Sequence, residues 1–271
     1  MAIVALHSAA TGLGALSTQI DVIANNLANI NNDGFKASRV NFEDLMYQQL
    51  AQPGVENANG DERPTGIHVG LGTRISGTDH DFRQGGVRQT DRPLDFMIKG
   101  EGFFRVKILD DQSPDGFGYT RSGNFFINSE GDLVLGTSFG PRLEPNIRVP
   151  DDAIRQSISI TSDGRIFAEI PGQGQEELGQ LELTTFVNPR GLSPIGGNIF
   201  IETEASGQPI TGDPGEDGRG EVINNHLEGS NVNPVTELVD LIKAQRYFEM
   251  NSQSIQAADQ ALQVVANLRR F

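Results

Sequence analysis

The sequence contains no cysteine and no tryptophan, and only 7% of its 271 residues are aromatic. Without cysteine there can be no disulfide framework, no thiolate metal site and no cysteine nucleophile. Carbohydrate sites usually present aromatic platforms, so the presence of only three Tyr argues against such a site. Paired acids for glycoside hydrolysis stay open, because 36 carboxylates allow many pairings and nothing selects one.

Positive charge is also scarce. Lys and Arg total 21 against 36 Asp and Glu, which gives a net charge of −15. Such a chain repels phosphate backbones and anionic lipid headgroups, so we expect no nucleic-acid partner and no membrane insertion. No apolar run is long enough to span a bilayer. The first basic residue is Lys36, so the start lacks the charged region of a Sec signal, and we expect any export to use another route.

Glycine is missing from the two ends of the chain. Of 32 Gly, two lie in residues 1–33 and none in residues 231–271. Because Gly weakens helix interiors and favours turns, this distribution predicts helical ends and a turn-rich middle.

Both ends carry apolar residues at the a and d spacing of a heptad repeat. The pattern predicts a helix over residues 1–32 and another from Pro234 to Arg270, with Asn233 as its N-cap and Arg269 and Arg270 complementing its dipole. In the N-terminal stretch the two rows are Leu6, Leu13, Ile20, Leu27 and Ala9, Leu16, Ile23, Ile30. In the C-terminal stretch they are Leu241, Phe248, Ile255, Leu262 and Ala244, Asn251, Ala258, Val265.

Each apolar seam needs a partner, and two alternatives are open. The helices pack on each other or on the body of the same chain, or they pack on neighbouring copies and form a polymer. Residues 1–32 contain one charged side chain, Asp21, which suggests a helix packed on several sides. The second alternative predicts that a fragment of residues 34–230 stays folded without the ends.

The middle of the chain is predicted to form β-structure. Short apolar runs separated by Gly, Asn and Asp turns, with no helix between them, favour an antiparallel sandwich or barrel-like fold. The expected fold class is α+β, mainly β, with long terminal helices forming a coiled-coil-like domain. We expect three parts: 1–33 plus 231–271 as a terminal helical domain, 34–80 as a connecting arm or β-hairpin segment, and 81–230 as a β-rich domain. Residues 51–66 are polar and are predicted to form an exposed loop.

Catalytic motifs are weak. Gly136–Gly140 matches G-x-S-x-G, but Pro141 follows at once and no α/β alternation surrounds it, so a turn is expected. Asp111–Gly116 has the first oxygen side chains of a calcium loop, but its twelfth position is Ser122, not Glu. The four His are scattered, and no nucleotide-binding glycine motif is present. We therefore expect no enzyme activity, no cofactor and no metal.

Five segments resemble the bacterial flagellar rod and hook protein family. Residues 24–36 (ANNLANINNDGFK) and 227–257 resemble its two terminal signatures. Residues 92–104 (RPLDFMIKGEGFF), 119–125 (YTRSGNF) and 187–192 (VNPRGL) resemble elements between them. The resemblance extends from about residue 3 to 268, in order. Residues 42–54 and 66–72 are most similar to the distal rod branch, with proximal rod or hook subunits as the alternative. Pro234 and residues 31–33 depart modestly from the signatures.

The resemblance implies a structural subunit that is exported unfolded by the flagellar type III apparatus and polymerises into the rod that transmits torque. It implies that the terminal helices pair and line a central channel. The implied partners are further copies of the chain, proximal rod and hook-type subunits, and the surrounding P- and L-ring proteins, in a basal body that spans the periplasm. A secreted β-rich binding module or enzyme is the remaining alternative.

Two sets of residues are expected to carry this assembly. The signature residues are Asn25, Asn26, Asn29, Gly34, Phe35, Gly229, Asn231 and Asn233. Apart from Phe35 they are Asn or Gly, and such short residues can cap helix ends and permit close packing. The self-assembly seams are Leu6, Leu13, Leu16, Ile20, Ile23, Leu27, Ile30, Leu241, Phe248, Ile255, Leu262 and Val265.

Overall fold

A computed structural model describes residues 2–54, 64–108, 113 and 115–268. The chain forms two compact units. The helical unit consists of Met1–Ala28, Ser38–Asp79 and Asn233–Phe271, and the β unit consists of Asn29–Ala37 and His80–Val232. The division into terminal helices, arm and β-rich domain stays a prediction.

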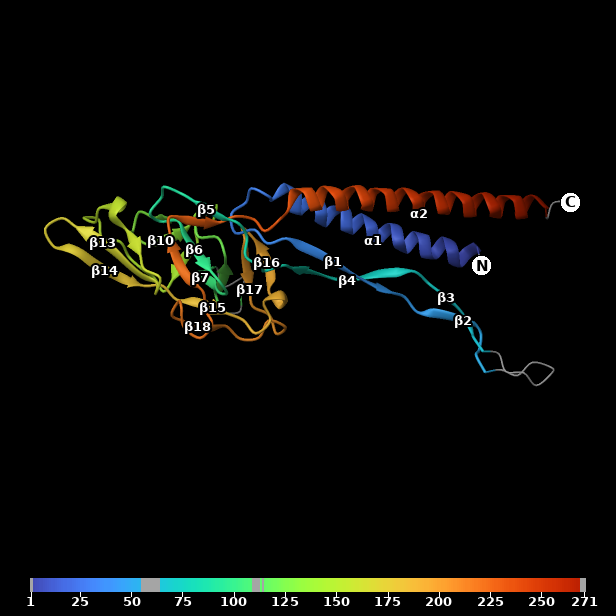
Figure 1. The fold of residues 1–271 in the computed structure, drawn as a ribbon, viewed down its shortest axis with the longest axis horizontal. Helices are drawn as coiled ribbons and strands as arrows, with labels where there is room; N and C mark the ends of the chain where they lie inside the picture. Colours follow the sequence, from blue (N-terminus) through green and yellow to red (C-terminus); the bar gives the residue numbers. More distant parts are fainter. Residues whose placement is uncertain (1, 55–63, 109–112, 114, 269–271) are drawn as a thin grey trace. The chain divides into compact units, whose positions relative to one another are not determined.

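Two long helices dominate the helical unit, α1 (Ala2–Ala28) and α2 (Pro234–Leu268) (Figure 1). The predicted cap of α2 is confirmed. The Asn233 side-chain oxygen accepts hydrogen bonds from the backbone N–H groups of Val235 (3.0 Å) and Thr236 (3.3 Å). Pro234 takes the first helical position, where its missing N–H costs nothing. Arg269 and Arg270, predicted to complement the helix dipole, lie outside the described residues.

The end of α1 differs from the prediction. The helix ends at Ala28, so Ile30 lies in the following turn and not on the helical seam. The cause is the Asn-rich sequence of residues 29–32. Asn side chains compete for backbone hydrogen bonds, and Asn32 bonds back to Asn29 through both its backbone and its side chain.

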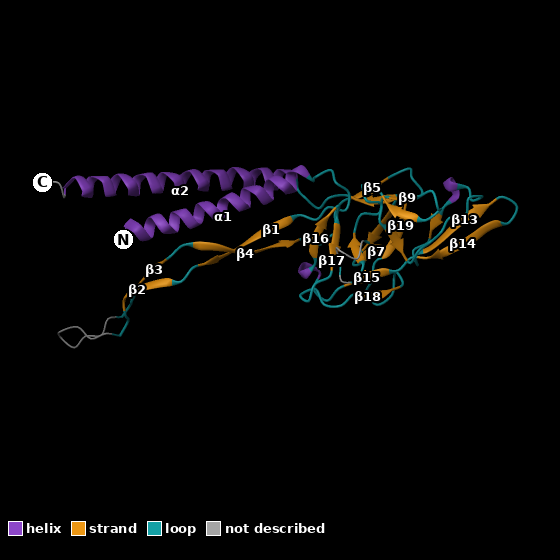
Figure 2. Cartoon of the chain, turned by 180° about the vertical axis from the view of Figure 1, so that it is seen from behind, coloured by secondary structure: helices purple, strands orange, loops and turns teal. Residues whose placement is uncertain are grey.

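The helices α1 and α2 pack against each other, and they diverge toward the N-terminus of α1 (Figures 1 and 2). Ala9, Ala15 and Ile23 on α1 and Ala244 on α2 are buried. Gly12 faces Asn251, because a Cβ atom built on Gly12 would lie 3.3 Å from the Asn251 amide nitrogen. The one polar residue of the α2 rows therefore lies opposite a glycine of α1. A supercoiled geometry for this pair stays a prediction.

A two-part β arm completes the helical unit. Strand β1 (Ser38–Asp44) pairs with β4 (Thr73–His80), and β2 (Tyr47–Ala51) pairs antiparallel with β3 (Ile67–Gly70). The arm lies against α1, since Ser8 donates to the Gly70 carbonyl (3.3 Å) and the Thr73 N–H donates to the Thr11 hydroxyl (3.4 Å). Most of the predicted loop 51–66 falls on residues 55–63, outside the described residues.

In its described residues, the β unit holds strands β5 to β20 and two short 3₁₀ helices (Figure 2). Nine of these strands form one sheet that branches at β7, which pairs with β8, β11 and β15. The strand pairs of this unit are antiparallel, as predicted. The strands are β5 (Val87–Gln89), β6 (Phe96–Lys99), β7 (Phe103–Lys107), β8 (Phe117–Thr120), β9 (Phe125–Ile127), β10 (Leu133–Leu135), β11 (Arg142–Glu144), β12 (Ser159–Ile160), β13 (Arg165–Ile170), β14 (Gly174–Gln180), β15 (Leu183–Thr185), β16 (Ser193–Gly196), β17 (Ile199–Ile201), β18 (Ile210–Gly212), β19 (Glu221–Asn224) and β20 (His226–Glu228). The 3₁₀ helices are Arg155–Ser157 and Pro189–Gly191.

Two apolar clusters form the core of the β unit. The larger is centred on strands β6, β7, β9, β10 and β13, with Phe96, Phe104, Leu133 and Ile166 fully buried. The smaller is aromatic and contains Phe103, Tyr119, Phe186, Leu192 and Phe200, with Phe82 packed against it. Burial raises the pKa of Tyr119 to about 12.

The weak catalytic motifs do not form sites in the described chain. Residues 136–140 form bends and a turn after β10 with no helix behind them, so the strand–turn–helix context of a nucleophile elbow is missing there. Asp111, Gln112 and Pro114 of the calcium-loop pattern lie outside the described residues. Among those described, no three His, Asp or Glu side chains are placed to hold a metal ion. In the same part of the chain, no helix has the length and hydropathy needed to cross a bilayer.

Replacing Asn233 by alanine is expected to lower the free energy of unfolding of the helical unit by about 1 kcal/mol. The change removes the acceptor for the first N–H groups of α2. Far-UV circular dichroism during urea unfolding measures it, because both long helices belong to this unit. Asn233→Asp is the matched control, since aspartate caps equally well; equal loss in both variants would contradict the capping role.

Candidate assembly surface and buried signature network

Helix α2 exposes an unusual number of large apolar side chains. Each is more than a third exposed: Val235, Leu238, Val239, Ile242, Tyr247, Phe248, Met250, Leu262, Val264 and Val265. The arm adds Phe42, Met46, Tyr47, Leu50 and Ile67. Exposed apolar residues scattered singly are normal, but so many on one helix, with more on the arm, are typical of an interaction surface.

The predicted seam residues differ in burial between the two helices. On α1, Ile23 is buried, and the others are partly buried: Leu6, Leu13, Leu16, Ile20 and Leu27. On α2, Leu241 and Ile255 are partly buried, whereas Phe248, Leu262 and Val265 are exposed. The chain thus covers much of the α1 rows itself and leaves part of the α2 rows open. Their role in assembly stays a prediction.

Asn26 connects three segments of the helical unit. Its side chain donates to the Ser38 carbonyl and accepts from the Ser38 N–H, both at 2.9 Å. It thus pairs with both backbone groups of the first residue of β1, as a neighbouring strand does. Its amide also donates to the Glu237 carboxylate in the first turn of α2 (3.4 Å). Burial raises the pKa of Glu237, and the Asn26 bond opposes that rise. The neighbouring Asn25 is exposed.

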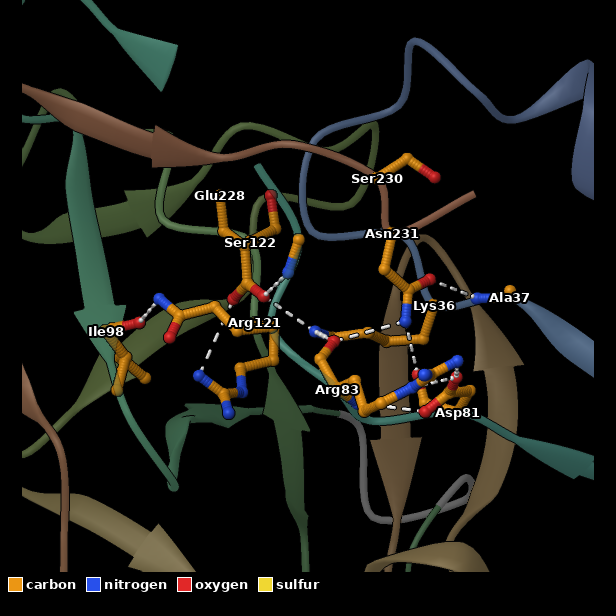
Figure 3. A network of polar contacts seen from close by, with 12 residues as sticks. Lys36, Ala37, Asp81, Arg83, Ile98, Arg121, Ser122, Glu228, Ser230 and Asn231 are labelled. Carbon is orange, nitrogen blue, oxygen red and sulfur yellow. Dashed lines mark hydrogen bonds and ion pairs between the residues drawn. The ribbon is translucent and has the colours of Figure 1, made fainter. Parts of the chain in front are cut away.

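A buried ion pair joins the first and last segments of the β unit (Figure 3). The Lys36 ammonium lies 2.6 Å from the Glu228 carboxylate, and each residue is 1% exposed. Lys36 also donates to the Arg83 carbonyl (2.8 Å), and the Gly85 N–H donates to the same Glu228 oxygen (2.8 Å). Burial lowers the pKa of Lys36, and the Glu228 charge opposes that change.

Arg121 is the second cation beside Glu228, and Figure 3 shows it approaching the carboxylate from a different side than Lys36. Its Nη1 lies 3.5 Å from the second Glu228 oxygen, and its Nη2 donates to the Gly100 carbonyl (2.7 Å). Burial lowers the pKa of Arg121. Two cations therefore converge on one carboxylate inside the β unit.

Three of the predicted signature residues surround this network. Asn231 accepts from the Ala37 N–H (2.8 Å) and donates to the carbonyls of Asp81 (2.7 Å) and Arg83 (3.1 Å). Gly34 donates its N–H to the Glu228 carbonyl. Its φ of 75°, and the Ser122 backbone 2.7 Å from where a Cβ atom would lie, together require glycine. Gly229 donates to the Gly86 carbonyl.

The remaining two signature residues lie in the turn after α1. Asn29 is partly buried and accepts from Asn32, and Phe35 is partly buried with its N–H bonded to the Asn32 carbonyl. The structure thus distributes the predicted signature between the units: Asn25, Asn26 and Asn233 in the helical unit, and the others in the β unit. This Asn- and Gly-rich pattern has a clear role inside one chain; its role between chains stays a prediction.

The sequence interpretation missed Lys36, Arg121 and Glu228. All three lie inside segments that resemble the family, Lys36 in 24–36, Arg121 in 119–125 and Glu228 in 227–257. The signal was therefore present as charged residues beside glycine and asparagine. A charge in such a motif is worth treating as a candidate for a buried pair.

A fragment of residues 29–232 is expected to be more stable than one of residues 34–230. The shorter fragment loses Asn231, whose three hydrogen bonds to backbone groups contribute about 1 kcal/mol each. Urea unfolding of both fragments measures the difference. The point variant Asn231→Ala in the longer fragment controls for chain length, and an equal midpoint for all three proteins would contradict the role of Asn231.

Three family models match the chain in order along its length. The model described as "Flagella basal body rod protein" matches residues 6–36. The model "Flagellar hook protein FlgE/F/G D1 domain" matches residues 97–168, and "Flagellar basal body rod FlgEFG protein C-terminal" matches residues 223–268.

Curated relatives cover nearly the whole chain. The flagellar basal-body rod protein FlgG of Borreliella burgdorferi is 43% identical over 98% of both chains. FlgG of Bacillus subtilis is 37% identical over 98% of both chains. The flagellar hook-basal body complex protein FlhP of the same organism is 29% identical over 97% of this chain and 98% of its own. The chain belongs to the family of flagellar basal-body rod proteins.

Proposed function

We propose that this structural rod subunit is specifically a distal rod subunit, which polymerises with further copies of itself. The observation that carries the proposal is a comparison of two proteins of Bacillus subtilis. The chain is 37% identical to FlgG and 29% identical to FlhP of that organism, each over nearly the full length. The 43% identity to the Borreliella burgdorferi FlgG supports the same branch.

The α2 surface supports the polymer. Burying a Leu or Val side chain fully contributes about 1.5–3 kcal/mol, and α2 and the arm expose more than ten large apolar side chains. Contacts between different surfaces of successive copies do not close into a ring and give a helical filament. In this proposal α1 and α2 form a coiled-coil-like pair that packs on the same pair of neighbouring copies, and the predicted seam residues carry those contacts.

The proposed partner proteins are those that would adjoin a distal rod in the basal body. They are proximal rod subunits at one end, hook-type subunits at the other, and P- and L-ring proteins around the outside. The acidic chain, with a net charge of −15, would present its carboxylates to the rings. Export unfolded through the flagellar type III apparatus and a location across the periplasm belong to the same proposal, as does the transmission of torque to the hook.

A proximal rod or hook subunit is the second candidate. It is favoured by the full-length match to FlhP, named as a hook-basal body complex protein, and by the hook-protein model over residues 97–168.

Electron microscopy of basal bodies from a strain that lacks this gene tests the proposal. A short rod without a hook is expected, because hook subunits then have no distal rod to build on. A full-length rod that lacks only its hook would assign the chain to the hook instead. Complete basal bodies on swimming cells would contradict both candidates.

A further inference from the structure

A cavity of about 250 Å³ lies in the β unit beside the aromatic cluster. Phe82, Phe103, Phe186 and Arg121 are among its lining residues. Pockets for drug-sized ligands and cofactors usually measure about 300–1,000 Å³. The cavity is therefore suited to one or two amino-acid side chains and is small for a cofactor.

The apolar wall of the cavity is fixed by ring contacts. The rings of Phe82 and Phe103 meet edge to face with centroids 5.3 Å apart, and those of Phe103 and Phe186 at 5.9 Å. Phe103 and Phe186 are buried, and they pack into the aromatic core of the unit. Such a wall offers a preformed surface to a second aromatic or aliphatic side chain.

Arg121 supplies the polar end. It is 3% exposed, and its Nε and Nη1 atoms make no hydrogen bond to any residue that the structure describes. Its Nη1 has only the longer 3.5 Å ion pair with Glu228, whose other oxygen is held by Lys36 at 2.6 Å. The guanidinium also lies 5.4 Å from the centre of the Phe103 ring. The Nε and Nη1 atoms are themselves buried, so Arg121 acts on an occupant of the cavity through its positive charge.

The charges around the cavity also favour an anion. Its lining includes three arginines, Arg83, Arg121 and Arg190, against two carboxylates, Asp81 and Glu101. Asp81 is already bound by the Arg83 side chain at 2.7 Å, and this bond lowers the pKa of Asp81. The lining is thus net positive within a chain of net charge −15.

We propose that this cavity receives a carboxylate side chain, with an aromatic or aliphatic neighbour, from an acidic peptide segment of a protein that packs against the β unit. The carboxylate lies beside the lining arginines Arg83, Arg121 and Arg190, and the apolar neighbour lies on Phe103 and Phe186. The proposal rests on the charge and shape of the cavity and does not depend on which rod or hook position the chain occupies.

Two matched peptides test the proposal on the full chain by ¹H–¹⁵N NMR. Acetyl-Glu-Phe-amide is expected to shift the backbone amides of Gly102, Arg121 and Phe186, which line the cavity. Acetyl-Gln-Phe-amide has the same shape without the charge and is expected to bind about tenfold more weakly, because charge-assisted hydrogen bonds are the stronger ones. Equal binding of both peptides, or no shifts at the cavity, would overturn the proposal.

A rim variant gives a second measurement that leaves the buried network intact. Arg190→Gln removes an exposed positive charge from the cavity lining. It is expected to weaken binding of the Glu peptide severalfold, whereas Arg155→Gln, at an exposed site that is not part of the lining, is expected to leave binding unchanged. Equal affinities of the wild type and both variants for the Glu peptide would overturn the proposal that this cavity receives a carboxylate.

Discussion

Replacing Lys36 by methionine is expected to lower the free energy of unfolding of the β unit by about 3 kcal/mol. Methionine keeps the apolar stem but removes the ammonium that lies 2.6 Å from Glu228. The carboxylate then stays buried with only Arg121 at 3.5 Å and the Gly85 N–H as partners. An ion whose partner is removed inside a protein loses more than an exposed pair ever contributes.

Urea unfolding followed by near-UV circular dichroism measures this effect. The chain has no tryptophan, and among its three tyrosines Tyr119 is buried in the β unit whereas Tyr47 and Tyr247 are exposed, so the signal follows this unit. Arg88→Met is the matched control, because the Arg88–Asp33 pair belongs to the same unit but Arg88 is largely exposed. It is expected to cost less than about 1 kcal/mol.

The double variant Lys36→Met, Glu228→Gln separates the pair from its surroundings. Its loss is expected to be smaller than the sum of the two single losses by about 1–3 kcal/mol, because each single change leaves an uncompensated charge. Additive losses, or a Lys36→Met variant as stable as Arg88→Met, would show that the pair does not hold the β unit together.

Replacing Leu262 by aspartate is expected to stop assembly while leaving the subunit folded. Leu262 is 36% exposed on α2, so the change removes only part of a buried apolar side chain and is expected to cost a single chain about 1–2 kcal/mol. In a polymer the same position would place an unpaired carboxylate in an apolar contact, which costs several kcal/mol at each subunit. Rod length by electron microscopy, swimming, and circular dichroism of the purified chain measure the two effects.

Two further variants separate folding from assembly. Ile23→Asp places the charge at a residue of α1 that is 6% exposed, and it should unfold the helical unit. Gln260→Asp adds the same charge at an exposed polar position of α2 and should leave rods normal. Normal rods in the Leu262→Asp strain would contradict the assembly role of Leu262.

Local patterns predicted the local structure well. The heptad rows and the Asn-Pro start predicted both helices and the cap of α2, because capping depends on neighbouring residues alone. Turn residues between apolar runs predicted an antiparallel β fold, because a turn also depends on neighbouring residues. The end of α1 was predicted too late, because the apolar spacing continues to Ile30 whereas the Asn side chains favour a turn.

Contacts between residues far apart in the sequence could not be predicted from the sequence pattern. Lys36 and Glu228 are 192 residues apart in sequence, and no periodicity relates them. Their pairing depends on how the first and last segments of the β unit meet, which only the fold determines. The predicted signature residues were named for contacts between copies, yet Asn26, Asn231 and Gly34 already make specific contacts within one chain.

Photo-crosslinking in flagellated cells tests the central claim most directly, that α2 joins neighbouring copies through its exposed apolar residues. A benzophenone amino acid in place of Val265, which is 61% exposed, should give a ladder of multiples of the 29.3 kDa chain after irradiation. The same group in place of Gln260, an exposed polar position of α2, should give far less. Single chains alone from both strains, in cells that still swim, would contradict the claim.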